Sequence, residues 1–362
     1  MSLVLAACGT SSHRQANPTP ARERSAPPGW ATVDDRLGRR LRTDHLAGAV
    51  LVVRHGGLEL RRRTYGRYNE HTVLPMASAS KWLTAATVMT LVDQGRLTLD
   101  APVSTYAPSL QGAVGRVTMR QLLAHTHGLS DAPACVLDPA QEPDLCDDEI
   151  SALAPVSAPG SQFHYGPTGP TLAARVVELL AGQPFEEAFQ ARIARPLAMA
   201  HTSFLGPAGP GAGPARTVPD PAAGVVSSAA DYLYFLEMLA SNGSAVGSVG
   251  VRVVLSPMSV SALLTVATAH AHFKDDQVAA DLPSIGYGLG AWVEQVGPDG
   301  LATFIDGSGA YGTYPWIDRR RGVYGILVVY DPVDPGATGA VARSRADVVA
   351  VGQALDRVGP HA

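Results

Sequence analysis

The chain has 362 residues, of which 46% are hydrophobic and 17% are charged. These values are typical of a globular protein with one large domain or two interleaved ones. The formal net charge of −4 at pH 7 gives no reason to expect a nucleic acid or an anionic membrane surface as a partner. No apolar run approaches the length of a membrane span. Composition therefore points away from nucleic-acid binding and membrane spanning.

The first 29 residues have the composition of a signal and a tether. Residues 5–8 read Leu-Ala-Ala-Cys and resemble the lipobox of a bacterial lipoprotein, in which the cysteine, here Cys8, becomes the acylated first residue. The preceding stretch is short and lacks a basic region, so an accidental cysteine in a disordered N-terminus is the alternative. Residues 9–29 are rich in Ser, Pro, Ala and Arg, as linkers are. We expect a truncated lipoprotein signal, export to the cell envelope, and a lipid anchor as the only membrane contact.

Strands are expected near both ends of the chain, with helices between them. The N-terminal elements are a helix and a two-stranded hairpin, over residues 33–43, 49–54 and 58–66. The middle of the chain is helical, over residues 76–93, 119–124, 168–181, 185–194, 229–239 and 258–264. The C-terminal strands, separated by turn signals, cover residues 288–296, 302–305, 313–318 and 323–330, and a helix over 340–358 follows.

This order of elements predicts an α/β fold of the α+β type. A central antiparallel sheet is assembled from both chain ends and flanked by helices, with an inserted, mostly helical subdomain. We expect residues 30–115 and 285–362 to form the sheet domain and residues 116–284 the helical one. The acidic group at residues 147–149 is interpreted as the solvated start of a helix.

The most informative stretch is the start of the helix over residues 76–93. Ser78 and Lys81 are three residues apart in its first turn and therefore share one helix face. The chain has only two lysines, Lys81 and Lys274, and otherwise uses arginine. Arginine stays charged, whereas a lysine in an apolar pocket can lose its proton and act as a base. Since N–H groups of a first helical turn can also hold an oxyanion, the pair indicates a nucleophilic serine rather than a helix cap beside a surface charge.

Further motifs follow this pair in an order that resembles the serine β-lactamase and penicillin-binding protein superfamily, in particular its class C, esterase and D-aminopeptidase branch. Residues 121–129 look like that branch's LLxHTSGL segment, and residues 224–231 resemble its GLxSTAxDL segment. Residues 163–169 stand where its Tyr-x-Asn motif is expected, and residues 287–290 are similar to the start of YGLGW. The resemblance spans residues 47–330, and it implies the β-lactamase/transpeptidase-like fold and no metal or organic cofactor.

The resemblance also implies the roles of individual residues. Ser78 would be the acylated nucleophile, and Lys81 and Tyr165 would together relay its proton. The backbone N–H groups of Ser78 and Ala310 would form the oxyanion hole. The alternative for Tyr165 is a loop aromatic packed against Pro167.

The chain departs from the family's pattern at two substrate-binding positions. Pro167 replaces the asparagine of Tyr-x-Asn and offers no side-chain amide. The third motif, usually Lys-Thr-Gly or His-x-Gly, aligns with Gly307, Ser308 and Gly309, so no cation is present there for a substrate carboxylate. The neighbouring Asp306 would repel one. Uncharged esters or amides are therefore the expected substrates.

The remaining candidate sites are cysteines and histidines. In an exported protein Cys135 and Cys146 have a natural use as a disulfide across a loop. Zinc is disfavoured because partner ligands at a recognisable spacing are absent from the sequence around them. The pair His125 and His127 also lacks a third ligand at a persuasive spacing, and we expect a structural loop and no metal site.

The sequence thus predicts an exported serine hydrolase that forms an acyl-enzyme on Ser78 and is most similar to carboxylesterases. One alternative is a β-lactamase or D,D-peptidase that acts on β-lactams or peptidoglycan stems. An alternative from a different class is a non-catalytic binding module of the cell envelope. The expected partners are small esters, amides or β-lactams.

Overall fold

The computed structural model describes residues 29–138, 143–206, 216–247, 250–269, 271–273 and 286–358. Cys8 and Lys274 lie outside these ranges. Within them, no helix is long and apolar enough to cross a membrane.

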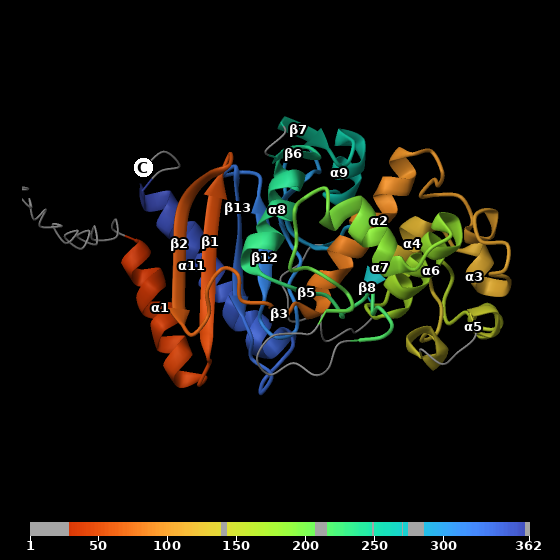
Figure 1. The fold of residues 1–362 in the computed structure, drawn as a ribbon, viewed down its shortest axis with the longest axis horizontal. Helices are drawn as coiled ribbons and strands as arrows, with labels where there is room; N and C mark the ends of the chain where they lie inside the picture. Colours follow the sequence, from red (N-terminus) through yellow and green to blue (C-terminus); the bar gives the residue numbers. More distant parts are fainter. Residues whose placement is uncertain are drawn as a thin grey trace, which may run out of the picture.

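A seven-stranded antiparallel sheet joins the two ends of the described chain (Figure 1). Its strands, in spatial order, are β2 (Leu58–Gly66), β1 (Gly48–His55), β13 (Val323–Val329), β12 (Tyr314–Asp318), β11 (Ala302–Asp306), β10 (Trp292–Val296) and β9 (Gly286–Tyr287). Strand β1 pairs with β13 from Ala49 opposite Val329 to His55 opposite Val323. The predicted fold class, with a sheet built from both termini, is confirmed.

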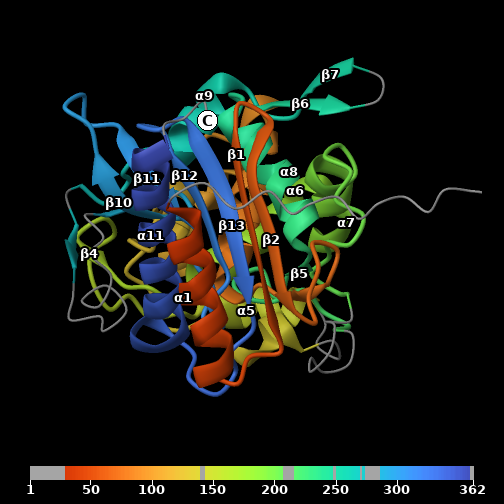
Figure 2. The same ribbon diagram turned by 90° about the vertical axis from the view of Figure 1, so that its left-hand side faces the viewer.

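Helices cover both faces of the sheet. Helices α1 (Trp30–Thr43) and α11 (Ala342–Val358) lie side by side on one face, as Figure 2 shows. Helix α1 turns Trp30, Val33 and Leu37 inward at helical spacing. Helix α8 (Ala229–Ala240) packs on β12 and β13 from the opposite face. Strand β1 is buried on both faces because both layers cover it.

The helical part of the molecule is organised around α2 (Ser80–Asp93). Every residue from Ser80 to Leu91 is buried, as expected for a helix surrounded by the core. The other helices of this part are α3 (Gly112–Arg116), α4 (Met119–Leu123), α5 (Pro143–Ser151), α6 (Thr168–Ala181), α7 (Phe185–Phe189) and α9 (Pro257–Leu263). Helix α4 begins with a capping box between Thr118 and Gln121, as the sequence predicts for Thr118.

Two expected elements differ from the structure, and one hairpin was not expected. Ser78 does not lie in the first α-helical turn; it belongs to a 3-10 turn, Ala77–Ala79, and α2 begins at Ser80. The expected strand over residues 288–296 begins only at Trp292, as β10, because residues 288–291 form the turn between β9 and β10, with Gly290 at φ 85°. An exposed hairpin of β6 (Ser244–Gly247) and β7 (Gly250–Val253) was not predicted.

The remaining short elements connect these layers. They are β3 (Leu74–Pro75), which pairs with β5 (Val226–Ser227), β4 (Gln162–Phe163), which is parallel to β8 (His272–Phe273), the 3-10 turns Val103–Thr105 and Ala134–Leu137, and the π-helical turns Gln190–Ala194 and Ala337–Val341.

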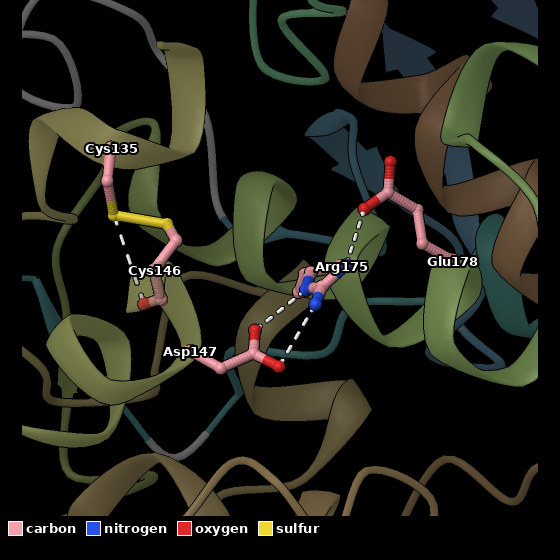
Figure 3. The surroundings of a disulfide bond; sticks show 5 residues. All are labelled: Cys135, Cys146, Asp147, Arg175 and Glu178. Atoms are coloured by element: carbon pink, nitrogen blue, oxygen red, sulfur yellow. Dashed lines mark hydrogen bonds and ion pairs between the residues drawn. A yellow bond between two sulfur atoms is a disulfide. The ribbon is translucent and has the colours of Figure 1, made fainter. Parts of the chain in front are cut away.

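Cys135 and Cys146 form the predicted disulfide, with their Cα atoms 5.6 Å apart (Figure 3). The next residue, Asp147, corrects an expectation, because it is buried rather than solvated. It accepts two hydrogen bonds from Arg175 of α6, at 2.7 and 3.0 Å (Figure 3). This bond is the main reason that the pKa of Arg175 is raised. The partner is 28 residues away in the sequence, so local composition could not reveal it.

Candidate active site

Ser78 lies in a tight turn between β3 and α2. The turn follows Ala77 at φ 46°, a left-handed conformation that non-glycine residues seldom adopt. Ser80 Oγ holds the turn, because it donates to Ala77 O at 2.6 Å and accepts from Val225 N at 3.0 Å. Ser78 itself is half-buried, so a substrate can reach its hydroxyl. Backbone strain beside a nucleophile is frequent at functional sites.

Lys81 connects Ser78 to two other parts of the chain. Only 4% of Lys81 is exposed. Its Nζ donates to Ser78 Oγ at 3.1 Å and to Ala222 O at 3.0 Å. The same Nζ lies 4.5 Å from the centroid of the Tyr165 ring, within the range of a cation–π contact. The structure therefore brings together all three predicted members of the catalytic group.

Tyr165 packs against aromatic side chains at the edge of the sheet. Its ring stacks on Trp292 with the centroids 5.1 Å apart, and it meets Tyr287 nearly edge-on at 5.9 Å. Trp292 and Tyr287 are directly opposite each other on β10 and β9. The edge of the sheet thus positions this tyrosine. The sequence placed Tyr287 in a family motif but gave no sign that it would contact Tyr165.

The segment that follows β11 passes close to the Ser78 turn. Gly309 N donates to Thr313 O at 2.8 Å, which keeps this segment beside β12. A Cβ on Gly309 would lie only 2.1 Å from Met76 O, so the close approach requires glycine. The next residue is the half-buried Ala310. The Ala310 backbone therefore directly follows a residue that approaches the Ser78 turn, as the second donor of an oxyanion hole would need.

The predicted substrate-binding positions supply no charged side chain. Gly307 faces Trp82, since a Cβ on Gly307 would lie 2.9 Å from Trp82 Cε3. Ser308 is buried, with 6% exposed. Pro167 is exposed and immediately precedes α6. The structure therefore gives a site whose third motif is uncharged at every position.

Asp306 corrects the expectation that it would repel a carboxylate. It is buried, with 1% exposed. Burial, and secondly the charge of Glu294, raise the pKa of the Asp306 carboxyl well above its usual range. Its Oδ1 accepts from Ser308 N at 3.0 Å. Burial thus favours the uncharged form of this carboxyl, which shapes the segment 306–308 through its hydrogen bond from Ser308 N.

Comparison with known proteins identifies the family. The model of the Beta-lactamase family matches residues 33–350. The chain belongs to this family. A structure of a candidate β-lactamase from Bacteroides dorei DSM 17855 is similar to it with a TM-score of 0.77 and 29% identity, over 90% of this chain and 98% of that one. The predicted family is thus confirmed, together with the fold that it implies.

Two curated relatives of this Beta-lactamase family member are named as different kinds of protein, an esterase and a penicillin-binding protein. Esterase EstB of Burkholderia gladioli is 36% identical over 202 residues, which cover 48% of this chain and 51% of EstB. Penicillin-binding protein 4 of Amycolatopsis lactamdurans is 34% identical over 180 residues, which cover 46% of this chain and 47% of that protein. The chain spans about half the length of these relatives.

Two buried histidines of this family member predict that the folded protein loses stability as the pH falls. Burial is the main cause that lowers the pKa of His127 to about 4, and it also lowers the pKa of His125 well below its usual value. In the unfolded chain both titrate near 6.5. The unfolded chain therefore binds more protons below pH 6.5, and the free energy of unfolding decreases as the pH falls from 6.5 towards 4. His127 alone accounts for a loss of about 3 kcal/mol.

Urea unfolding at pH 7 and pH 4.5 measures this loss. The matched variant is His127→Asn, because an asparagine can still accept the Leu129 N–H that His127 Nδ1 accepts at 3.1 Å. We expect the free energy of unfolding to differ less between the two pH values in the variant than in the wild-type protein. If the free energy of unfolding falls by the same amount between pH 7 and pH 4.5 in both proteins, His127 is not the cause of the loss.

No group of three or more His, Cys, Asp or Glu side chains that could hold a metal ion occurs in the part of the chain that the structure describes. His125 and His127 instead belong to the buried loop that follows α4.

Proposed function

We propose that this member of the Beta-lactamase family is a serine hydrolase that cleaves an ester or amide through an acyl-enzyme on Ser78, and that it is carboxylesterase-like. The observation that carries the proposal is the 3.1 Å contact between Lys81 Nζ and Ser78 Oγ, with Tyr165 against the same Nζ. A nucleophile within hydrogen-bond reach of a base that a third group orients is the geometry of covalent catalysis.

In the proposed reaction, Ser78 Oγ attacks the substrate carbonyl while its single proton is taken up by the Lys81–Tyr165 pair, which shares it until the leaving group departs. The carbonyl oxygen becomes an oxyanion, which the backbone N–H groups of Ser78 and Ala310 stabilise. When the oxyanion collapses, the bond to the leaving group breaks and the leaving group receives the proton. Water then attacks the acyl ester by the same route in reverse, which releases the acid and restores the Ser78 hydroxyl.

An uncharged ester is the substrate class that the site favours. Gly307, Ser308 and Gly309 give no cation for a substrate carboxylate, and Pro167 gives no side-chain amide for a peptide-like substrate. Asp306 is buried, and burial raises the pKa of its carboxyl, so it offers no exposed charge to such a group. The name of Esterase EstB supports the same class, as the property of a relative.

A β-lactamase or D,D-peptidase is the second candidate, because another relative is a penicillin-binding protein. It would require a different residue, such as an arginine, for the substrate carboxylate. Competition by penicillin during turnover of a neutral aryl ester separates the two. Weak competition is expected for an esterase, and strong competition with acylation of Ser78 would favour the second candidate.

Ser78→Ala is expected to abolish covalent labelling by an aryl fluorophosphonate. This probe needs no substrate carboxylate, and it reacts only with an activated serine. Intact mass should show one probe adduct on the wild-type protein and none on the variant. A folded wild-type protein without an adduct would instead favour the non-catalytic binding module.

Export to the cell envelope remains part of the proposal. The Cys135–Cys146 disulfide supports it, because disulfides persist mainly in oxidising compartments. Acylation of Cys8 would be seen as a lipid-sized mass increase that a Cys8→Ser variant lacks. The Cys8 segment lies outside the described residues.

A further inference from the structure

His125 is a buried side chain that the proposed reaction does not use. Only 1% of it is exposed. Neither ring nitrogen, Nδ1 nor Nε2, has a hydrogen-bond partner among the residues that the structure describes. A buried polar group without a partner costs free energy, and such exceptions call for an explanation.

The backbone of His125 is also unusual. Its φ of 57° lies in the left-handed region, which few residues other than glycine and asparagine adopt readily. His125 O accepts from His164 N at 2.9 Å. This bond ties the loop after α4 to the residue before Tyr165. The hydrogen bond holds the loop that carries the imidazole beside the segment of the candidate catalytic tyrosine.

Aromatic rings surround the imidazole. Its centroid lies 4.8 Å from that of Tyr165, 5.0 Å from that of Tyr287 and 5.9 Å from that of Phe163. The ring of Tyr165 is therefore contacted both by His125 and by the Nζ of Lys81. Trp292 also contacts the rings of Tyr165, Tyr287 and Phe163, with its own stacking role on Tyr165.

The imidazole is neutral when the enzyme works. Burial is the first cause that lowers the pKa of His125, and the charge of Lys81 on α2 is the second. His127 and His164 act in the same direction, while the other side chains facing the ring, Tyr165 and Tyr287, carry no positive charge. A neutral imidazole bears one N–H. That N–H can point at the faces of the surrounding aromatic rings and form a weak N–H···π contact.

We propose that His125 is a positioning residue for Tyr165: its neutral imidazole seats the phenol ring against Lys81 and directs an N–H at the surrounding aromatic rings. To accept the Ser78 proton, Tyr165 must be in its phenolate form, which carries negative charge on the ring system, and an N–H dipole beside it stabilises that charge without adding a second cation near Lys81. The inference rests on the proposed function, since it assigns Tyr165 to the proton relay.

Two variants separate this role from simple packing. His125→Phe keeps an aromatic ring and removes the N–H, whereas His125→Asn keeps a polar donor and tolerates the left-handed backbone. His127→Asn is the control, because His127 is equally buried in the same loop and is engaged with Leu129 N. The readouts are aryl fluorophosphonate labelling of Ser78 and kcat and KM for a neutral aryl ester, from pH 5 to 10.

For His125→Phe we expect labelling and kcat to fall by roughly 2-fold to 5-fold with KM unchanged. The midpoint of the rising limb of the pH profile should move upward by about half a unit, and His125→Asn should restore part of this change. His127→Asn should not change the midpoint of the rising limb. A His125→Phe protein with the wild-type limb and kcat would show that only packing matters, and it would overturn the inference.

A second measurement does not depend on activity. In Ser78→Ala protein labelled with ¹⁵N-histidine, we expect His125 to be a neutral single tautomer whose N–H proton is shifted upfield by a neighbouring aromatic ring. A protonated ring, or an N–H without that shift, would overturn the inference. If the wild-type protein is not labelled by the probe while this signal is present, the proposed hydrolase function fails and the placement of His125 stands.

Discussion

Replacement of Lys81 by methionine is expected to lower the rate of Ser78 acylation about a thousandfold, the central value for loss of a general base. The reason is that Lys81 Nζ is the group that contacts Ser78 Oγ, Ala222 O and the Tyr165 ring together. Methionine fills a similar volume and stays in the core, but it cannot exchange a proton. The rate of fluorophosphonate labelling and kcat/KM for a neutral ester measure the effect.

Lys81→Arg is the matched variant. Arginine keeps the positive charge and can still donate to Ala222 O, yet it does not give up its proton in a protein. We therefore expect Lys81→Arg to be nearly as inactive as Lys81→Met. An active Lys81→Arg protein would show that a fixed charge is sufficient, and it would remove Lys81 from the proton relay. Circular dichroism and thermal unfolding establish that both variants are folded.

The parts of the fold that could be predicted depend on local signals. Helix α6 occupies the predicted residues, and α4 begins at the predicted Thr118 cap, because apolar spacing and capping act over a few residues. The sheet from both termini followed from alternating strands and turns at each end of the chain. Gly290 was missed as a strand break, because its turn also reflects a tertiary contact: a Cβ there would lie 2.5 Å from Lys81 O.

The predicted site depended on motif order, and its limits have a physical cause. Ser78, Lys81 and Tyr165 come from separate segments that the structure brings together, while their chemical roles stay predictions. The raised pKa of Asp306 could not be read from the sequence, because it results from burial and from Glu294 on the neighbouring strand. The same holds for the aromatic surroundings of Tyr165, which the loop after α4 and the paired strands β9 and β10 supply.

Gly309→Ala is expected to lower kcat roughly 100-fold, with a smaller change in KM, because it disturbs the proposed oxyanion hole. The added Cβ would lie 2.1 Å from Met76 O. Met76 cannot easily retreat, since its own N donates to Val225 O at 2.9 Å in the pairing of β3 with β5. The segment 307–310 must therefore move away from the Ser78 turn, and the Ala310 N–H moves with it.

The control for this prediction is Gly38→Ala in α1. A Cβ on Gly38 would meet only Arg42 Nη1, at an ordinary distance of 3.7 Å. This change should raise helix stability by about 1 kcal/mol and leave kcat unchanged. Steady-state kinetics together with thermal unfolding distinguish a lost oxyanion donor from general destabilisation. If Gly309→Ala keeps wild-type kcat while folded, residues 307–310 do not supply the second donor, and the oxyanion must be stabilised from another part of the site.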